Sequence, residues 1–179
     1  MDERATADPG QRCRWLPGLV AAAGVLALAL ACAPQGGVGT HKGNVAPDFS
    51  LPTPDGGAEN LRSYRGRVVV LNFWATWSVP CGAEMPDLQA AYAELRERGL
   101  VVVGVNQGDR PADVAAFARE FGLAFPVLVD EERAIGHKYG VSACPTTFII
   151  DRRGVIREVL VGGPLTRTAV RRHVEGLLK

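Results

Sequence analysis

Cysteine is scarce in this chain of 179 residues, and its four cysteines do not form a closely spaced pair. Cys13 and Cys32 lie near the N-terminus, which leaves Cys81 and Cys144 for the remainder of the chain. Two cysteines permit one disulfide pairing. Together with three histidines that share no spacing, they build no conventional zinc site. We therefore expect no bound metal and no other cofactor.

An excess of charge of one sign is also missing. The 20 Lys and Arg residues nearly balance 19 Asp and Glu residues, for a formal net charge of +1, and no basic cluster stands out. Nucleic-acid binding needs a basic surface, so we do not expect it. A length of 179 residues with 47% hydrophobic residues indicates one globular domain with a proper core.

The N-terminus indicates where the protein resides. Arg12 and Arg14 precede an uncharged stretch rich in Ala and Leu, typical of an export signal or a membrane anchor. Its apolar part, residues 16–33, is at the lower limit of the ~17–25 residues that a membrane helix needs. Cys32 is a lipidation candidate, because Leu28-Ala-Leu-Ala-Cys32 resembles the lipobox of bacterial lipoproteins. Lipidation, cleavage without lipid and an uncleaved anchor all place the domain outside the cytoplasm.

The remaining chain divides into a spacer and a domain. We interpret residues 1–34 as the signal peptide or membrane anchor, 35–43 as a flexible Gly-rich spacer and 44–179 as the domain. Apolar runs at 67–73 and 100–105 predict strands buried on both faces, and 125–129 predicts a further extended segment. Helices are expected at 79–98, 112–121, 131–139 and 166–178, with a hairpin at 146–161. This order predicts a three-layer α/β domain with a central mixed sheet flanked by helices.

The loop after the first buried strand carries the candidate chemistry. It reads Trp74-Ala-Thr-Trp-Ser-Val-Pro-Cys81, at the carboxyl end of a strand, where such sheets place their sites. Ser78 is a favoured helix N-cap, and we expect its hydroxyl to accept a hydrogen bond from the Cys81 N–H. Cys81 lies in the first helical turn, where the helix dipole favours a reactive thiolate. The alternative is an inert core thiol.

At these residues the chain resembles the TlpA/ResA type of extracytoplasmic thioredoxin-like proteins, in the redoxin or AhpC-TSA-like superfamily. The matching segments span nearly all of residues 44–179 and include Ala46-Pro-Asp-Phe-Ser-Leu51, Val69-Val-Leu-Asn-Phe-Trp-Ala-Thr-Trp77, Pro80-Cys81, Glu84-Met-Pro86 and Pro145-Thr-Thr-Phe-Ile-Ile-Asp151. The resemblance implies a thioredoxin-like fold and reduction of protein disulfides, often on apocytochrome c during cytochrome c maturation. It also implies a membrane electron donor.

The resemblance assigns roles to the site residues. Ser78 occupies the position of the family's attacking cysteine, and Cys81 that of its resolving cysteine. A cis Pro145 is implied, with its loop against the active-site loop, which brings Cys144 near both. We hypothesise a relocated redox pair, with Cys144 as the exposed nucleophile and Cys81 as the resolving thiol; the reverse order stays open. Glu84 occupies the family's glutamate position and is a candidate for proton transfer, or simply an acidic residue well placed in a first helical turn.

The same resemblance places a substrate groove at Trp77, Ser78, Pro80, Pro145 and Thr146. Two other functions stay open. Ser78-x-x-Cys81 also matches the Ser/Thr-x-x-Cys of peroxiredoxins, so Cys81 is a candidate peroxidatic thiol. However, Trp74 and Pro145 stand where that family has its proline and its active-site arginine. The other alternative is a binding module or holdase that keeps the groove and has lost redox turnover.

Overall fold

A computed structural model describes residues 37–179 of the chain. The predicted signal or anchor at 1–34, with the lipidation candidate Cys32, lies outside the described residues. No helix within 37–179 is both long and apolar enough to cross a membrane. Part of the predicted spacer packs along the domain, since the Gly39 N–H donates to the Val45 carbonyl at 3.0 Å and the Gly43 N–H to Ile156 at 2.8 Å.

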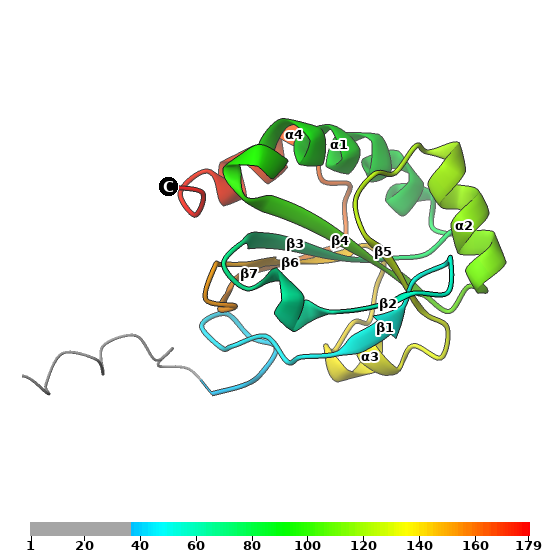
Figure 1. Ribbon diagram of the computed structural model, residues 1–179, viewed down its shortest axis with the longest axis horizontal. Helices are drawn as coiled ribbons and strands as arrows, with labels where there is room; N and C mark the ends of the chain where they lie inside the picture. Colours follow the sequence, from blue (N-terminus) through cyan, green and yellow to red (C-terminus); the bar gives the residue numbers. More distant parts are fainter. Residues whose placement is uncertain (1–36) are drawn as a thin grey trace, which may run out of the picture. The chain divides into compact units, whose positions relative to one another are not determined.

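Five strands form one mixed sheet in the order β5-β4-β3-β6-β7 (Figure 1). Its strands are β3 (Val68–Trp74), β4 (Leu100–Gln107), β5 (Val127–Asp130), β6 (Thr146–Ile150) and β7 (Ile156–Val161). Strands β3, β4 and β5 run parallel, β6 is antiparallel to β3, and β7 is antiparallel to β6. Every residue of β3 and β4 is buried, as their continuous apolar runs predict.

Helices α1 (Val79–Leu95), α2 (Pro111–Glu120) and α4 (Arg167–Val174) contribute to the core on one side of the sheet. Because side chains alternate along a strand, Val68, Val70 and Trp74 of β3 face this core. Figure 1 shows α1 and α4 on the same side of the sheet, and a short 3-10 helix, η2 (Arg96–Arg98), leads from α1 to β4.

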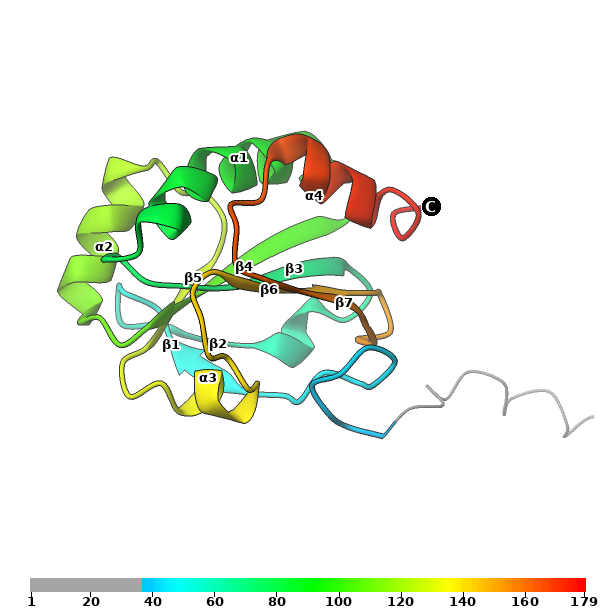
Figure 2. The same cartoon turned by 180° about the vertical axis from the view of Figure 1, so that it is seen from behind.

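The opposite face of the sheet carries smaller elements. They are the hairpin of β1 (Ser50–Pro52) and β2 (Ala58–Asn60), the 3-10 helix η1 (Leu61–Tyr64) and α3 (Ala134–Lys138). The alternate β3 residues Val69, Leu71 and Phe73 belong to this second core. Figure 2 shows the same layers from behind, with α3 and the hairpin across the sheet from α1 and α4. The predicted three-layer α/β fold with a mixed sheet is confirmed.

Helix α3 is shorter than the predicted helix at 131–139, because the Asp130 carboxylate turns the chain. Its oxygens accept hydrogen bonds from the backbone N–H groups of Ile135 at 3.2 Å and Gly136 at 2.8 Å. Arg133 precedes the helix in the left-handed region with φ 58°. The buried carboxylate thus satisfies the first N–H groups of α3, and the helix begins only at Ala134.

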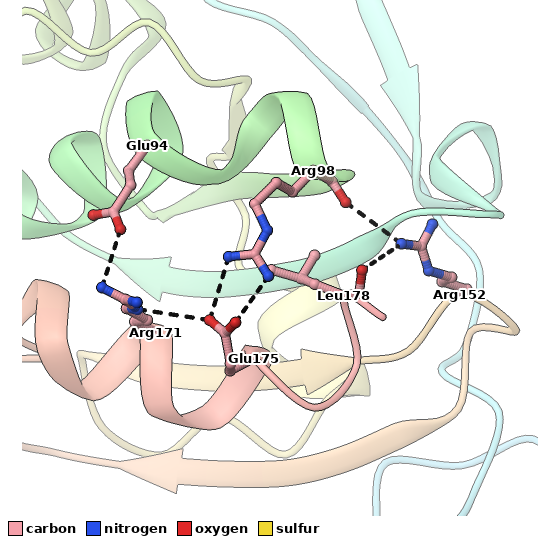
Figure 3. Close-up of polar contacts among 6 residues, drawn as sticks. All are labelled: Glu94, Arg98, Arg152, Arg171, Glu175 and Leu178. Carbon is pink, nitrogen blue, oxygen red and sulfur yellow. Dashed lines mark hydrogen bonds and ion pairs between the residues drawn. The ribbon is translucent and has the colours of Figure 1, made fainter.

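A surface network joins α4 and the end of the chain to α1, η2 and the turn after β6 (Figure 3). Its side chains are Glu94, Arg98, Arg152, Arg171 and Glu175. Arg98 Nη2 lies 2.8 Å from Glu175 Oε1, and Arg152 Nη2 donates to the carbonyls of Arg98 and Leu178 at 3.4 and 3.2 Å. Exposed ion pairs of this kind contribute little stability. The position of α4 therefore depends mainly on its buried side chains Val170 and Val174, which pack in the core.

Candidate active site

The sheet brings two distant loops to one place. Strand β3 ends at Trp74, and the chain turns through residues 75–78 before α1 begins. Antiparallel β6 pairs Thr146 with Phe73, so the segment before β6 lies beside the carboxyl end of β3. The Cys144–Pro145 peptide bond is cis, as the resemblance implies. The loops that carry Cys81 and Cys144 therefore meet at one end of the sheet.

The two cysteines of this region are free thiols in contact with the same core. Cys81 has 0% of its surface exposed, and Cys144 is half-buried. Cys144 lies close enough to Cys81 to be the main cause that lowers the pKa of the Cys81 thiol. Within residues 37–179 no group of three or more His, Cys, Asp or Glu side chains is arranged to hold a metal ion. The convergence that the resemblance implied is present, with no bond between the sulfurs.

The thiols share one proton unequally. Hydrogen bonding from Cys144 is the main cause that lowers the pKa of Cys81 to about 6, against the opposing effect of burial. The hydroxyl of Ser78 and the backbone of Ala75 also stabilise the Cys81 thiolate. The same contact raises the pKa of Cys144, because its proton is held between the two sulfurs. One thiolate is thus available near neutral pH, and it resides mainly on Cys81.

The hydrogen bond predicted for Ser78 is wrong, although the residue is the N-cap of α1. Its side chain accepts nothing from the N–H groups of the helix. Instead, Ser78 Oγ donates to the Cys144 carbonyl oxygen at 3.2 Å. The hydroxyl also lies within hydrogen-bonding reach of the Cys81 sulfur. The bond to the Cys144 carbonyl draws the hydroxyl toward the neighbouring loop, so Ser78 links the two loops of the site.

Glu84 lies one turn beyond Cys81 and is completely buried. Its Oε1 accepts a hydrogen bond from Asn72 Nδ2 at 2.7 Å, and its Oε2 accepts one from the Leu165 N–H at 2.9 Å. Burial is the largest cause that raises the pKa of Glu84 to about 7, and the nearby Cys81 adds to it. A carboxyl of this kind holds and releases a proton near neutral pH, beside the reactive sulfurs.

Glu84 makes stability depend on pH. Because its pKa is raised from 4.5 to about 7 on folding, the neutral carboxyl stabilises the fold fully below pH ~4.5, and this contribution is lost as pH rises toward 7. Relative to Glu84→Gln, we expect the free energy of unfolding of the unaltered protein to fall by about 3 kcal/mol across that window. Urea unfolding at a series of pH values measures the difference. The exposed Glu97→Gln is the control, and a pH-independent difference would contradict the prediction.

A model of the AhpC/TSA family matches residues 42–159. The chain belongs to this family. It is 38% identical over 135 residues to the thiol-disulfide oxidoreductase ResA of Geobacillus thermodenitrificans, a match that covers 75% of this chain and 77% of that protein. The predicted relationship to redoxins of the ResA kind is therefore confirmed.

Solved structures of other redoxins agree with the fold. A Chlorobium tepidum protein described as a thiol:disulfide interchange protein DsbE superposes with a TM-score of 0.72 at 33% identity, covering 78% of this chain and 99% of that one. A secreted thiol-disulfide isomerase of Corynebacterium glutamicum has a TM-score of 0.69 at 28% identity, covering 74% and 84%. The homologues are thiol-disulfide oxidoreductases, and the Corynebacterium protein is a secreted one.

The predicted groove residues of this redoxin differ in exposure. Trp77 is 63% exposed and Pro80 is exposed, so both present surface beside the thiols. Pro145 and Thr146 are buried, and the Thr146 hydroxyl donates to the Ala143 carbonyl at 2.7 Å. Thr146 thus shapes the loop that carries Cys144. Contact of these residues with a substrate stays a prediction.

Two further residues lie at the candidate site and were not predicted from the sequence. Asn72 donates to Glu84 and, at 2.9 Å, to Thr147 Oγ1. Its signal was available, because it is the one polar side chain in the apolar run of β3. Arg133 lies near Cys144 through the folding of the chain, and nothing in its sequence neighbourhood indicated this.

Proposed function

We propose that this redoxin reduces disulfide bonds of extracytoplasmic proteins with Cys81 and Cys144 as its dithiol. The contact between these two thiols is the observation that carries the proposal. Ser78 stands where the resemblance places the attacking cysteine, so the usual sequence-adjacent dithiol is absent. The activity of the homologues supports thiol-disulfide exchange as the reaction class.

The exposure of Cys144 supports an order for the steps. After the shared proton moves to Cys81, the half-buried Cys144 thiolate attacks a substrate disulfide R–S–S–R′. A Cys144–S–S–R bond forms, and the leaving R′S⁻ takes the proton from Cys81 to become R′SH. The Cys81 thiolate then attacks Cys144 Sγ, which forms the Cys81–Cys144 disulfide and releases RS⁻. That anion takes a proton from Glu84 or from water, and two electrons have passed to the substrate.

The proposal also names a substrate, an electron donor and a location. We propose apocytochrome c as one substrate and a dithiol donor at the membrane as the reductant that restores both thiols. The chain would act outside the cytoplasm, held by its N-terminus as an anchor or lipoprotein, or free in the periplasm after cleavage. The apolar stretch before residue 35 and the secreted relative support this location.

Peptide mapping of the oxidised protein tests the proposal. Mild oxidation of the full chain should produce one linked peptide pair that joins Cys81 to Cys144, and this pair should be absent from Cys81→Ser. Free alkylation of both thiols after the same treatment would argue strongly against it. Rapid peroxide consumption that requires Cys81 would instead indicate a peroxidase. Partner binding that survives loss of both thiols, without turnover, would indicate a holdase.

A further inference from the structure

A small pocket opens beside Cys144. Its volume is about 100 Å³, and it is lined by residues that include Trp77, Gln107, Arg133 and Cys144. Arg133 is the one charged residue in this lining. Pockets for drug-sized ligands are larger, at ~300–1,000 Å³. This pocket therefore fits one side chain or one small polar group next to the Cys144 thiol.

The Arg133 side chain is held on two sides although the residue is exposed. Its guanidinium carbon lies 6.0 Å from the ring centroid of Trp77, within cation–π range. On another side it passes over Gly108, where an added Cβ would lie 2.5 Å from Arg133 Nε. Arg133 itself has φ 58°, a conformation that is unfavourable for arginine. The fold thus accepts local strain at Arg133, whose guanidinium packs against Gly108 and Trp77 at the pocket.

The guanidinium N–H groups of Arg133 have no hydrogen-bond or ion-pair partner within the part of the chain that the structure describes. No carboxylate within residues 37–179 forms an ion pair with it. The acidic Asp109 is engaged elsewhere, because its Oδ2 accepts hydrogen bonds from the Thr76 N–H and Asn106 Nδ2, both at 2.8 Å. A guanidinium presents five N–H donors in a planar fork that matches a carboxylate. The positive charge also acts on Cys144, where it favours the thiolate and opposes the causes that raise the pKa.

We propose that Arg133 and Trp77 form a carboxylate-binding subsite that selects disulfides with a carboxylate close to the sulfur that meets Cys144. This inference rests on the proposed function and adds its substrate class. The carboxylate belongs either to an acidic residue near the substrate cysteine or to a small acidic thiol. In both cases ion pairing with Arg133 places the substrate sulfur over Cys144 before exchange.

Alkylation of the reduced full-length protein tests the subsite without disulfide turnover. Iodoacetate carries a carboxylate and iodoacetamide does not, while both convert Cys144–S⁻ to a thioether and release iodide. We expect Arg133→Gln to lower the iodoacetate-to-iodoacetamide rate ratio at Cys144 by about 5-fold, the range of a modest charge-assisted pair. Any change in thiolate fraction cancels in the ratio. The exposed Arg172→Gln is matched in charge and should keep the ratio of the unaltered protein. An equal ratio with and without Arg133 would overturn the proposal.

Paired substrates identify the source of the carboxylate. One pair is a disulfide peptide with Glu or Gln next to cysteine; the other is 3,3′-dithiodipropionate against 2-hydroxyethyl disulfide. A preference for the acidic member of a pair that disappears in Arg133→Gln supports the subsite. If the preference is seen with the peptides, the carboxylate comes from a protein; if it is seen with the small disulfides, it comes from a small thiol. Reduction of all four without preference overturns it. If the protein keeps its alkylation selectivity but reduces none of the four disulfides, the proposed function is wrong and the carboxylate-binding subsite stands.

Discussion

Replacing Cys144 with serine is expected to lower disulfide-reductase turnover by on the order of 10³-fold or more, because a hydroxyl at this position neither ionises near neutral pH nor forms a mixed disulfide. The half-buried Cys144 is the thiol that a substrate can reach, while Cys81 has 0% of its surface exposed. Turnover of a disulfide peptide, followed by thiol release, measures the effect. Unchanged thermal unfolding of Cys144→Ser would show that the loss is chemical.

The complementary variant fixes the order of the two thiols. Cys81→Ser keeps the proposed nucleophile and removes the resolving thiol, so it should accumulate a mixed disulfide between Cys144 and the substrate peptide. Mass spectrometry of the intact protein detects this adduct directly. If Cys144→Ser instead traps a substrate on Cys81, the order is reversed, and the buried thiol must become accessible during the reaction.

Ser78→Cys is expected to move the disulfide. The new thiol would occupy the N-cap of α1, three residues before Cys81, where the helix N-terminus stabilises a thiolate. Residues three apart at the start of a helix fall within the ~4.4–6.8 Å Cα separation that a disulfide needs. Oxidation should then join 78 to 81 and leave Cys144 free. We expect turnover to rise by about tenfold, because the attacking thiol is now supported by the helix terminus.

Two measurements decide this second prediction. Peptide mapping after mild oxidation reports which cysteines are linked, and a persistent link between Cys81 and Cys144 would show that the spatial pair outcompetes the helical one. Ser78→Ala separates gain of a thiol from loss of the hydroxyl. Since the Ser78 hydroxyl stabilises the Cys81 thiolate, Ser78→Ala should raise the pH at which Cys81 becomes reactive toward iodoacetamide and leave the linkage unchanged.

Much of the fold could be predicted because its elements are locally encoded. Strands β3 and β4 are apolar throughout their length, and a strand with two covered faces has this pattern. The start of α3 could not be predicted in the same way. It depends on the Asp130 carboxylate, whose hydrogen bonds to Ile135 and Gly136 form only when the chain folds back.

The candidate site also combines residues that could be predicted from the sequence with contacts that form only on folding. Cys81 was found from its place in the first helical turn, while Glu84 and the approach of Cys144 came from the family resemblance. The direction of the Ser78 hydroxyl was not predictable, because its acceptor is a carbonyl of residue 144 in another loop. The position of Arg133 likewise depends on Gly108 and Trp77, which are distant in sequence.

Because α1 meets the loop before β6, a disulfide between Cys81 and Cys144 would close a long loop of the chain. A disulfide within a Cys-x-x-Cys motif closes a four-residue loop and restricts the unfolded chain by about 2 kcal/mol. A bond from Cys81 to Cys144 spans β4, α2, β5 and α3, and a loop of that length corresponds to about 4 kcal/mol in the same chain-entropy model. The oxidised domain would thus be cross-linked across most of its topology. Each turnover would then convert the protein between a disulfide-linked and a reduced form. The disulfide-linked form would resist proteolysis more than the reduced form.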